Sequence, residues 1–485
     1  MSEAPSAQML DALKAIVGDA GWLCSAEDTA PFSRDFRQLY QGRAALVLRP
    51  NSVQQVMAVV TLCHQESIAI VPQGGNTSYC GGATPDASGH QVILCLSRLA
   101  RVREVDAQSY TMTLDAGCTL QRAREVAHAA HRHFPLSLGS EGSCQIGGNL
   151  STNAGGTAVL RYGMMRDLVL GLEVVLPDGS LLNQLKGLRK DNTGYDVKQL
   201  FLGAEGTLGI ITGACLKLSP QATDYMTALV AIDHIGSAVA LLSRLRSHFG
   251  EIVERFEYLP DIAHQLLLQH IAGVTPPFAT SYPALVLVEL QAPGPWPELT
   301  ARVEDFLGAE AAASHILNAV IAKSFSERDA FWFMREHIPE AQTREGASIK
   351  HDVSLPISAL HDFVTRATAL ISSIAPEARI VGYGHVGDGN LHFNVSPPAG
   401  VTRDSPNEAA FLALAPTITR AVHDLVAELG GSFSAEHGIG QLKVGELTRY
   451  EDPVALTLMQ RIKAAVDPKN IMNPGKVIQY PSDKS

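Results

Sequence analysis

The sequence has a deficit of positive charge and contains no cluster of it. Its 485 residues include 38 Lys and Arg against 49 Asp and Glu, which gives a formal net charge of −11, and no Lys- or Arg-rich block occurs. Nucleic acids and anionic membrane surfaces are bound through basic patches, so we expect neither as the main partner. A small anionic substrate is not excluded, because it needs only a few positive side chains in one place.

Long apolar runs and paired cysteines are also absent. No apolar run approaches the ~20 residues of a membrane span, and the acidic, amphipathic N-terminal segment resembles neither a secretory signal nor a transit peptide. Seven cysteines are scattered without a CxxC pair. Such cysteines are typical of free thiols in a reducing compartment and not of a disulfide framework or a zinc finger. We therefore predict no membrane span and a cytoplasmic location.

The length of the chain and its pattern of predicted helices and strands indicate more than one domain. A chain of 485 residues is longer than one hydrophobic core supports. In the first half short β runs alternate with glycine-rich turns, whereas in the second half long helical patterns alternate with strands, and together these predict the α+β class. We place a first domain at residues 1–222, a second with helices on an antiparallel sheet at 223–460, and a C-terminal helix and tail at 461–485.

Glycine-rich loops are concentrated in the first half. Ser52 is predicted to cap a helix at 53–64, and a short strand at 68–71 then opens into the first of these loops. The three loops are residues 72–82, 139–156 and 203–209. Glycine allows close backbone approach, and exposed N–H groups in such loops form nests for phosphate. Each loop alone is also compatible with an ordinary turn, and none is a GxGxxG or Walker motif. Three together favour one long ligand, such as a dinucleotide.

The stretch YGHVGDGNLHFNV, residues 383–395, places two histidines around a turn broken by glycines. The alternation after the turn predicts a half-buried strand with His392 and Asn394 on one face, which is either solvated surface or the lining of a site. Two histidines with a carboxylate, here Glu436 in SAEHGIG (434–440), are a common ligand set for Zn²⁺ or Mn²⁺. Most of the 17 histidines are nevertheless expected to be surface or satisfied core residues.

Four stretches resemble, in order along nearly the whole chain, signatures of the FAD-linked oxidases of the vanillyl-alcohol-oxidase type. They are PQGGNTSYCGG, IGGNLSTNAGG, RKDNTGYDVKQLFLGAEGTLGIIT and VDPKNIMNPGK. The resemblance implies a two-domain FAD-binding fold with an antiparallel-sheet substrate domain. It implies that the FAD pyrophosphate is held by Gln73, Gly74, Gly75, Asn76 and Thr77. The residues implied to line the rest of the cofactor are Gly147, Gly148, Asn149, Thr152, Asn153, Gly155, Glu205, Gly209, Ile211 and Asn473.

Some relatives tether FAD covalently through His or Cys. The first loop of this chain has no His, and Cys80 is off the usual attachment position, so we expect non-covalent FAD.

GHVGDGNLHFNV and SAEHGIG resemble the metal-containing branch of this family, which includes D-2-hydroxyglutarate dehydrogenase, mitochondrial-type D-lactate dehydrogenase and the flavin subunit of glycolate oxidase. The resemblance implies a divalent metal, with zinc favoured over manganese, bound by His385, His392 and Glu436. It also implies that His437 is the general base and that Asn394 contacts the substrate.

Two basic residues match family residues that bind the carboxylates of the substrate. They are Arg335 and Lys350, although for the arginine alone a surface pairing with Glu336 or Glu340 is the simpler alternative. The motifs are most similar to those of D-2-hydroxyglutarate dehydrogenase. Pro339 departs from that pattern, because those enzymes carry a threonine there, and this leaves room for a shorter acid.

The resemblance implies an FAD-dependent dehydrogenase that converts a D-2-hydroxy acid to the 2-oxo acid, with D-2-hydroxyglutarate as the first choice. A D-lactate or glycolate dehydrogenase, or a non-catalytic flavin-binding subunit of a redox complex, is the alternative. The sequence has no haem or iron–sulfur motif, so we expect a separate electron acceptor such as an electron-transfer flavoprotein or a quinone. Relatives of this type suggest a homodimer.

Overall fold

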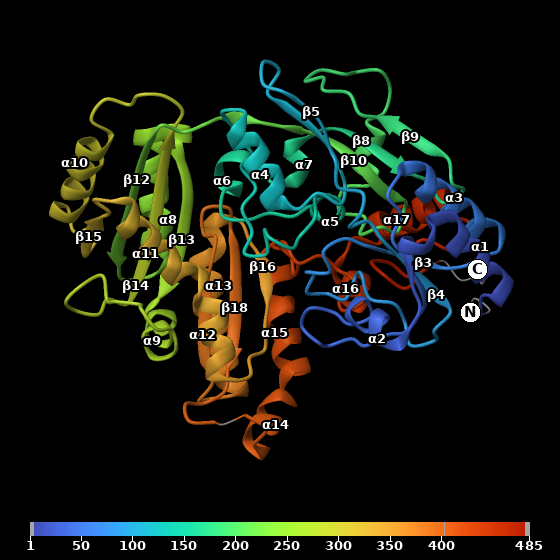
Figure 1. Cartoon of the computed structure of the whole chain (residues 1–485). Coiled ribbons are helices and arrows are strands. Elements are labelled where there is room, and N and C mark those ends of the chain that lie inside the picture. The colour runs from blue at the N-terminus through green and yellow to red at the C-terminus, as the bar shows by residue number, and fades with distance from the viewer. Residues whose placement is uncertain (1–3, 402, 481–485) are drawn as a thin grey trace. The chain divides into compact units, whose positions relative to one another are not determined.

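The computed structural model describes residues 4–401 and 403–480, which divide into two compact units (Figure 1). Unit 1 consists of Met1–Gly156, Gly163–Gln221 and Glu436–Ser485, and unit 2 of Thr157–Tyr162 and Ala222–Ala435. The short stretch Thr157–Tyr162 of the predicted first domain belongs to unit 2, and the long stretch of unit 2 begins at Ala222, the last residue of that predicted domain. The chain returns to unit 1 at Glu436 and not at 461, because the segment after Glu436 hydrogen-bonds to unit 1: the N–H groups of Gln441 and Leu442 donate to Cys80 O at 3.0 and 3.3 Å.

Unit 1 contains a mixed sheet and an antiparallel sheet. The four-stranded mixed sheet has the order β1 (Trp22–Leu23), β2 (Ala44–Leu48), β4 (Gln91–Cys95) and β3 (Ile70–Gln73). The five-stranded antiparallel sheet has the order β5 (Val102–Asp106), β6 (Thr111–Asp115), β10 (Ile210–Lys217), β8 (Val169–Val175) and β9 (Leu181–Gln184). A short pair joins β7 (Arg132–His133) to β11 (Ser219–Pro220). The central strand β10 is buried except at its last residue, which explains its nearly continuous apolar sequence.

The helices of unit 1 are α1 (Ala7–Val17), α2 (Ala26–Thr29), α3 (Val53–Gln65), α4 (Leu120–Ala129), α5 (Ile146–Ser151), α7 (Met165–Leu168), α16 (Val444–Tyr450) and α17 (Pro453–Val466). Helix α3 begins as predicted, because the Ser52 side chain accepts a hydrogen bond from Gln55 N at 3.3 Å. Its buried residues Val56, Val59, Val60 and Cys63 recur every three or four positions and form its core face.

A buried lysine ties the C-terminal part of unit 1 to the third glycine-rich loop. The Nζ of Lys463 on α17 donates to Thr207 O at 2.8 Å, to Met472 O at 2.8 Å and to Asp467 Oδ2 at 2.5 Å. All three N–H donors of the ammonium are therefore satisfied. The opposite charge of Asp467 offsets the cost of burying this lysine, which is 4% exposed.

Unit 2 contains two antiparallel sheets. The larger has the order β13 (Val253–Pro260), β14 (Ala284–Ala292), β12 (Asp224–Ile232) and β15 (Asn318–Ile321). The smaller has the order β16 (Asp352–Ser354), β18 (Asn390–Ser396) and β17 (Arg379–Tyr383). An antiparallel bridge between Tyr258 and Gly384 connects β13 to the end of β17. This bridge brings side chains of β13 to the turn between β17 and β18.

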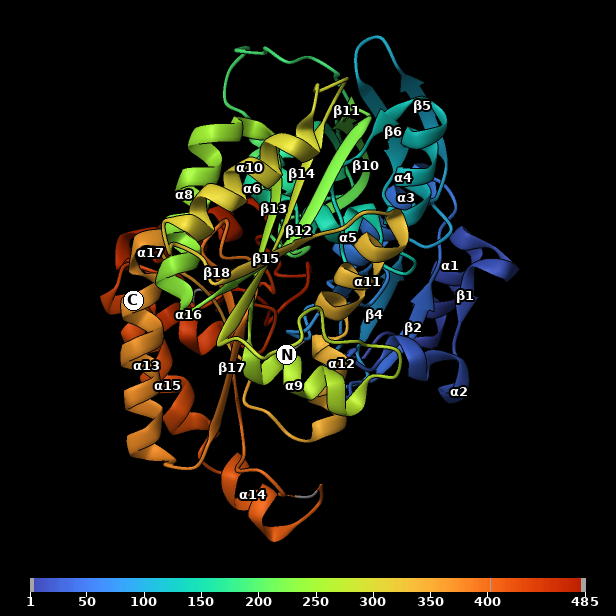
Figure 2. The same ribbon diagram turned by 90° about the vertical axis from the view of Figure 1, so that its left-hand side faces the viewer.

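The helices of unit 2 are α6 (Val159–Tyr162), α8 (Ile235–Phe249), α9 (Asp261–His270), α10 (Leu299–Ala312), α11 (Phe325–Glu336), α12 (Ile338–Glu345), α13 (Leu360–Ile374), α14 (Pro406–Leu412) and α15 (Ala415–Glu428). Helices α13 and α15 run side by side (Figures 1 and 2). Residues of α8 and α10 pack on one face of the larger sheet, whereas residues of α9, α11 and α12 pack on the other. Phe363 of α13 packs against Phe393 of the smaller sheet, with ring centroids 5.0 Å apart. The predicted antiparallel sheet covered by helices is thus present.

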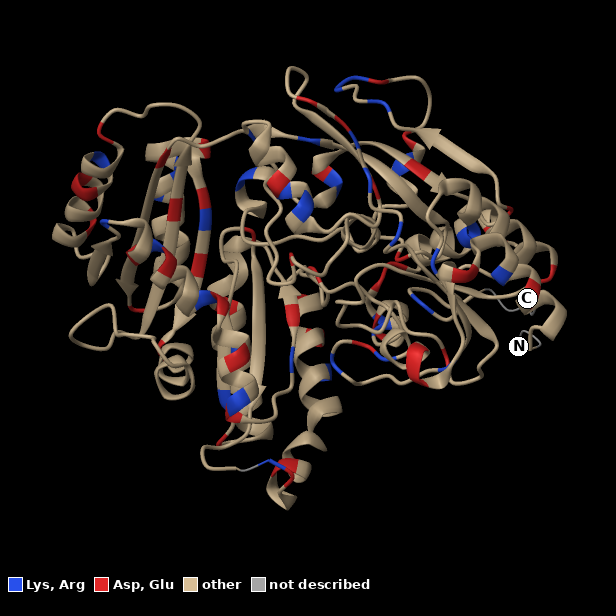
Figure 3. Ribbon diagram, viewed as in Figure 1, with Lys and Arg blue, Asp and Glu red and all other residues tan. Residues whose placement is uncertain are grey.

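Charged residues of both signs are scattered along the ribbon, and several lie inside unit 2 on β13 and β14 (Figure 3). Glu289 on β14 is fully buried, and its carboxylate accepts hydrogen bonds from Thr227 Oγ1, Arg328 Nε and Trp332 Nε1 at 2.8 to 2.9 Å. A buried carboxylate with such donors is satisfied and stabilises the packing of α11 on the sheet.

One described stretch, Pro406–Glu428, is long and apolar enough to cross a membrane by length and composition alone, with a mean hydropathy of 1.2. It spans α14 and α15, and Ile418, Val422 and Val426 are buried in the core of unit 2. A single such stretch is weak grounds for a membrane span, because core helices of globular proteins have the same composition.

Candidate active site

The register of the smaller sheet places the side chains of three residues in one row. On β18, His392 stands opposite Tyr383 of β17 on one side and opposite Asp352 of β16 on the other. Its Nδ1 lies 3.8 Å from Asp352 Oδ1. Asp352 is 3% exposed, and the Nδ2 of Asn390, on the same face of β18, donates to its Oδ1 at 3.0 Å. The predicted strand is confirmed, with Leu391, Phe393 and Val395 fully buried on its other face. It is not half-buried as predicted, because Asn390 and Asn394 on the face of His392 are buried as well.

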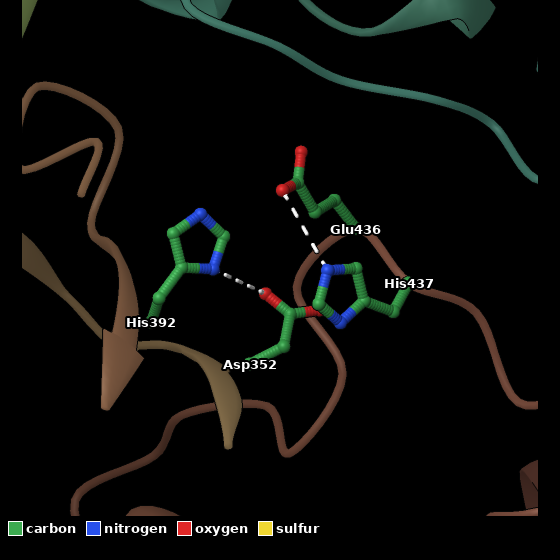
Figure 4. Close-up of side chains that lie close together, drawn as sticks. All are labelled: Asp352, His392, Glu436 and His437. Atoms are coloured by element: carbon green, nitrogen blue, oxygen red, sulfur yellow. Dashed lines mark ion pairs between the residues drawn. The ribbon is translucent and has the colours of Figure 1, made fainter. Parts of the chain in front are cut away.

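Asp352, His392, Glu436 and His437 form one group whose candidate ligand atoms all lie within 4.8 Å of one another (Figure 4). Ala435 N donates to Asp352 O at 3.3 Å, so the residue just before Glu436 and His437 is hydrogen-bonded to β16. Imidazole nitrogens with carboxylate oxygens are a donor set that suits Zn²⁺ and Mn²⁺. The group contains two of the three predicted metal ligands, the predicted base, and Asp352, which was not predicted.

The third predicted ligand, His385, lies beside this group. Its ring is edge-on to that of His392, with centroids 5.4 Å apart. Its Nδ1 lies 2.7 Å from Oε1 of Glu257, a fully buried residue of β13. Metal-ligating histidines commonly direct one ring nitrogen at a carboxylate, which fixes the orientation of the ring, and the contact of His385 with Glu257 is of this kind.

Glu257 also holds the predicted substrate-binding arginine. Its Oε2 accepts a hydrogen bond from Arg335 Nε at 2.7 Å, and the guanidinium lies over the Tyr383 ring at 5.0 Å. Arg335 is 6% exposed, so the alternative of a surface arginine paired with Glu336 or Glu340 is wrong. One carboxylate therefore fixes both a candidate metal ligand and a candidate carboxylate-binding group.

The pKa values of two carboxyl groups in this region are shifted in opposite directions. Burial by itself raises the pKa of Glu257, but the electrostatic attraction and hydrogen bonds of His385 and Arg335 outweigh it and hold the pKa at about 2. Burial raises the pKa of Asp388, in the turn between the two histidines, to about 6. Glu257 is thus an anion at neutral pH, which suits a residue that orients cationic or donor groups.

The other two predicted substrate residues belong to the smaller sheet or lie next to it. Asn394 is 3% exposed and donates from Nδ2 to Gln342 Oε1 at 2.9 Å. Lys350 is exposed and follows Ile349, whose N–H donates to Val395 O at 2.8 Å. Asn394 therefore shares a strand face with His392, and Lys350 precedes β16, which carries Asp352.

We expect Glu257→Gln to weaken divalent-metal binding about 10-fold or more, because residues that orient metal ligands contribute 10- to 100-fold in affinity. The glutamine amide has one acceptor oxygen and no negative charge, so it cannot accept hydrogen bonds from both His385 and Arg335 as the carboxylate of Glu257 does. Calorimetric titration of the metal-free protein with Zn²⁺ measures the change. Glu289→Gln is the matched control, since Glu289 is equally buried in the same unit but contacts neither histidine. An equal loss in the control would contradict the assignment to Glu257.

The first glycine-rich loop is shaped by its own polar side chains. Gln73 Nε2 donates to Phe32 O and Ala83 O at 2.8 and 2.9 Å, and Asn76 Nδ2 donates to Arg34 O at 2.8 Å. A Cβ on Gly75 would lie 2.0 Å from Ser143 O, so only glycine allows this loop to approach the second. A phosphate at this loop would therefore meet backbone groups rather than these two side chains.

An open gap lies where the first and second loops meet. Apart from its chain neighbours and the backbone of α5, no described atom lies within 4 Å of a Cβ built on Gly148, and a Cβ on Gly74 would have Gly148 N and Gln145 Oε1 as neighbours at 3.6 Å. Gln145 Oε1 and Asn149 Oδ1 are buried acceptors without a hydrogen-bond partner among the described residues. Unused acceptors beside glycines fit a ligand that brings its own donors, such as the ribose hydroxyls and ring N–H of FAD.

The remaining residues predicted to line FAD surround α5 and the third loop. Gly147 N donates to Ala116 O at 2.7 Å, and Thr152 Oγ1 donates to Gly148 O at 3.0 Å. Asn153, which accepts from Arg166 N at 2.8 Å, is followed by the buried Gly155. The predicted positions in or beside the third loop are Glu205, Gly209 and the buried Ile211 of β10.

Asn473, in the C-terminal tail, joins two of the loops. Its Nδ2 donates to Gly82 O and to Glu205 O, both at 2.8 Å, and its Oδ1 has no partner among the described residues. Cys80 Sγ lies 3.3 Å from Gly438 O as a hydrogen-bond donor. Non-covalent attachment of FAD stays a prediction.

Comparison with known proteins gives two family matches. Residues 221–477 match the family described as FAD linked oxidases, C-terminal domain, and residues 44–184 match an FAD binding domain. Among curated relatives, a mitochondrial D-2-hydroxyglutarate dehydrogenase of Bos taurus is 37% identical over 93% of this chain and 80% of the relative. A D-2-hydroxyglutarate–pyruvate transhydrogenase of Saccharomyces cerevisiae is 33% identical over 93% of this chain and 90% of the relative.

Solved structures confirm the predicted fold. p-Cresol methylhydroxylase aligns with a TM-score of 0.74 at 16% identity, covering 99% of each chain. Alkyldihydroxyacetonephosphate synthase aligns with a TM-score of 0.72 at 17% identity, covering 98% of this chain and 87% of the other. At such identities the likeness concerns the fold alone.

The predicted cytoplasmic location is contradicted. The relatives whose names carry a location, from plants, animals and Schizosaccharomyces pombe, are mitochondrial. Scattered free cysteines indicate a reducing environment and do not distinguish one reducing compartment from another, which is why the prediction failed.

Proposed function

The chain belongs to the FAD-linked oxidases, and from this membership we propose that it oxidises a D-2-hydroxy acid to the 2-oxo acid with FAD as the hydride acceptor. The observation that carries the proposal is the group formed by His392, Glu436, His437 and Asp352. A base beside a set of candidate metal ligands is what oxidation of an α-hydroxy carboxylate needs, because the hydroxyl must lose its proton as the Cα hydride leaves.

The chain's own residues would divide the work of binding and proton transfer. Nε2 of His437, the ring nitrogen that lies 4.0 Å from Glu436 Oε1, takes the hydroxyl proton of the substrate. Arg335, held by Glu257, and Lys350 bind carboxylate oxygens, and Asn394 adds an amide contact. The buried Tyr383, whose ring lies 5.2 Å from that of His392, limits the access of water to this region.

Two bound groups would supply the rest of the chemistry. A divalent metal, zinc before manganese, would be held by His385 through Nε2, by His392 and by Glu436, and as a Lewis acid it would favour loss of the hydroxyl proton. FAD would accept the Cα hydride at N5, so the two electrons leave with that hydride while the hydroxyl proton goes to His437. Electrons would then pass to a separate acceptor, such as an electron-transfer flavoprotein or a quinone. A homodimer is part of the same proposal.

D-2-Hydroxyglutarate is the first substrate candidate, because relatives that cover most of this chain carry that name. D-Lactate is the second, favoured by one residue. Pro339 stands in the first turn of α12, where it offers neither a hydroxyl nor an N–H to a distal carboxylate. A relative named as a putative D-lactate dehydrogenase, from Schizosaccharomyces pombe, is 35% identical over 98% of this chain and 90% of its own length.

We expect the purified protein to show a flavin band near ~450 nm that bleaches anaerobically with D- but not L-2-hydroxy acids. D-2-Hydroxyglutarate, D-lactate and glycolate are compared by the rate of bleaching, and D-2-hydroxyglutarate is expected to be fastest. Faster bleaching by D-lactate would replace the first candidate with the second. A colourless protein that takes up no FAD would contradict the cofactor itself.

A further inference from the structure

Glu205 of the third glycine-rich loop forms hydrogen bonds with the segment that carries the proposed base. It is 8% exposed, and its carboxylate accepts two hydrogen bonds from consecutive backbone groups, at 2.7 Å from Ile439 N and at 2.8 Å from Gly440 N. These residues lie two and three positions after His437. Because each oxygen binds one N–H, the carboxylate fixes both the position and the direction of this backbone.

The surroundings of Glu205 are built around its side chain. A Cβ on Gly438 would lie 2.7 Å from its Oε1, and a Cβ on Gly82 would lie 2.8 Å from its Oε2. Its own backbone is fixed as well, since its N–H donates to Ser151 O at 2.8 Å and its carbonyl accepts from Asn473 Nδ2 at 2.8 Å. The carboxylate is thus held at a fixed place by residues from four separate segments of unit 1.

The first glycine-rich loop contacts the same segment from another direction. The ring of Tyr79 is edge-on to that of His437, with centroids 4.6 Å apart. Cys80 O accepts from Gln441 N at 3.0 Å, just beyond the residues that Glu205 holds. Two of the loops expected to bind FAD therefore also support the proposed base.

We infer that Glu205 is a positioning residue for His437 and Glu436, in addition to its place beside the predicted flavin site. This inference rests on the proposed function, in which His437 takes the hydroxyl proton. Both carboxylate oxygens are directed at N–H groups of the 436–440 segment, so the side chain acts through that backbone and not on the substrate. Glutamine does not replace it, because its NH₂ group would face an N–H donor.

The test compares Glu205→Gln with Glu173→Gln. Glu173 is a matched control, since it is 4% exposed in the same unit and binds Arg103 and Thr212 at 2.7 and 2.9 Å. In Glu205→Gln we expect kcat to fall about 10- to 100-fold and Zn²⁺ affinity to fall by a similar factor, as for other residues that orient site groups. Rates are expressed per bound FAD, so that any loss of cofactor, beside which Glu205 is also predicted to lie, is separated from the loss of kcat. Amide hydrogen exchange at Ile439 and Gly440 should accelerate only in this variant.

A second variant keeps the carboxylate and displaces it. Gly82→Ala places a methyl group against Glu205 Oε2, so we expect it to reproduce the loss of kcat. Combined with Glu205→Ala, which removes the clash, it should add little further loss. Equal losses of kcat in Glu205→Gln and Glu173→Gln, or unchanged exchange at Ile439 and Gly440, would overturn the inference.

Failure of the proposed function would look different from failure of this inference. If the wild-type protein binds no Zn²⁺ and turns over no 2-hydroxy acid, the proposed function fails, whereas exchange at Ile439 and Gly440 still reports whether Glu205 holds the segment. If wild-type turnover is present and neither Glu205 nor Gly82 variants alter it, the proposed function stands and the positioning role is wrong.

Discussion

His437→Ala is expected to lower kcat by about 10²- to 10⁴-fold, the usual contribution of a general base, while bound FAD is retained. The imidazole lies 4.0 Å from Glu436 in the group that contains His392 and Asp352, so its loss removes the proton acceptor without removing any glycine-rich loop. Anaerobic stopped-flow reduction of the flavin by saturating substrate isolates the chemical step, and the intensity of the flavin band reports the cofactor.

His128→Ala serves as the control, because His128 is an exposed residue of α4 in the same unit. It should reduce the flavin at the wild-type rate. A His437→Ala variant that loses FAD together with activity would assign His437 a structural role. A variant that keeps the wild-type rate would move the base elsewhere, and Asp352 would then be the next residue to replace.

Local patterns in the sequence predict the local structure of this protein well. The side chain of Ser52 caps α3 as expected from its position before an apolar helical pattern. The alternation in LHFNV predicts β18, with His392 and Asn394 on one face. Both depend on neighbours within a few residues, where backbone geometry alone decides which side chains share a face.

Partners from distant segments could not be predicted in the same way. Glu257 is 128 residues from His385, and Glu205 is 234 residues from Ile439. Such contacts depend on sheet register and loop approach, which a single sequence does not specify. Asp352 is a clear case, since it meets His392 only because β16 and β18 pair in one particular register. The return of the chain to unit 1 at Glu436 likewise depends on contacts between distant segments, such as the hydrogen bonds of Gln441 and Leu442 to Cys80 O.

Removing the metal with a chelator is expected to lower turnover at least about 100-fold, because Lewis-acid stabilisation is worth several kcal/mol. Zn²⁺ should restore activity best and Mn²⁺ less well. His392→Ala should abolish high-affinity Zn²⁺ binding in calorimetry. His270→Gln should not, since His270 belongs to the same unit but pairs with Glu345 at 2.6 Å. Rescue by neither ion would contradict a metal-dependent mechanism.

The same titration distinguishes two ligand sets. If His385, His392 and Glu436 bind the ion, His385→Ala should weaken Zn²⁺ binding as strongly as His392→Ala, because Glu257 would then fix the orientation of a ring that binds the metal directly. Asp352→Asn should then have a smaller effect, since Asp352 Oδ1 already accepts from Asn390. The opposite order, with Asp352→Asn more damaging than His385→Ala, would show that the ion sits within the group of Figure 4 and that His385 only supports it.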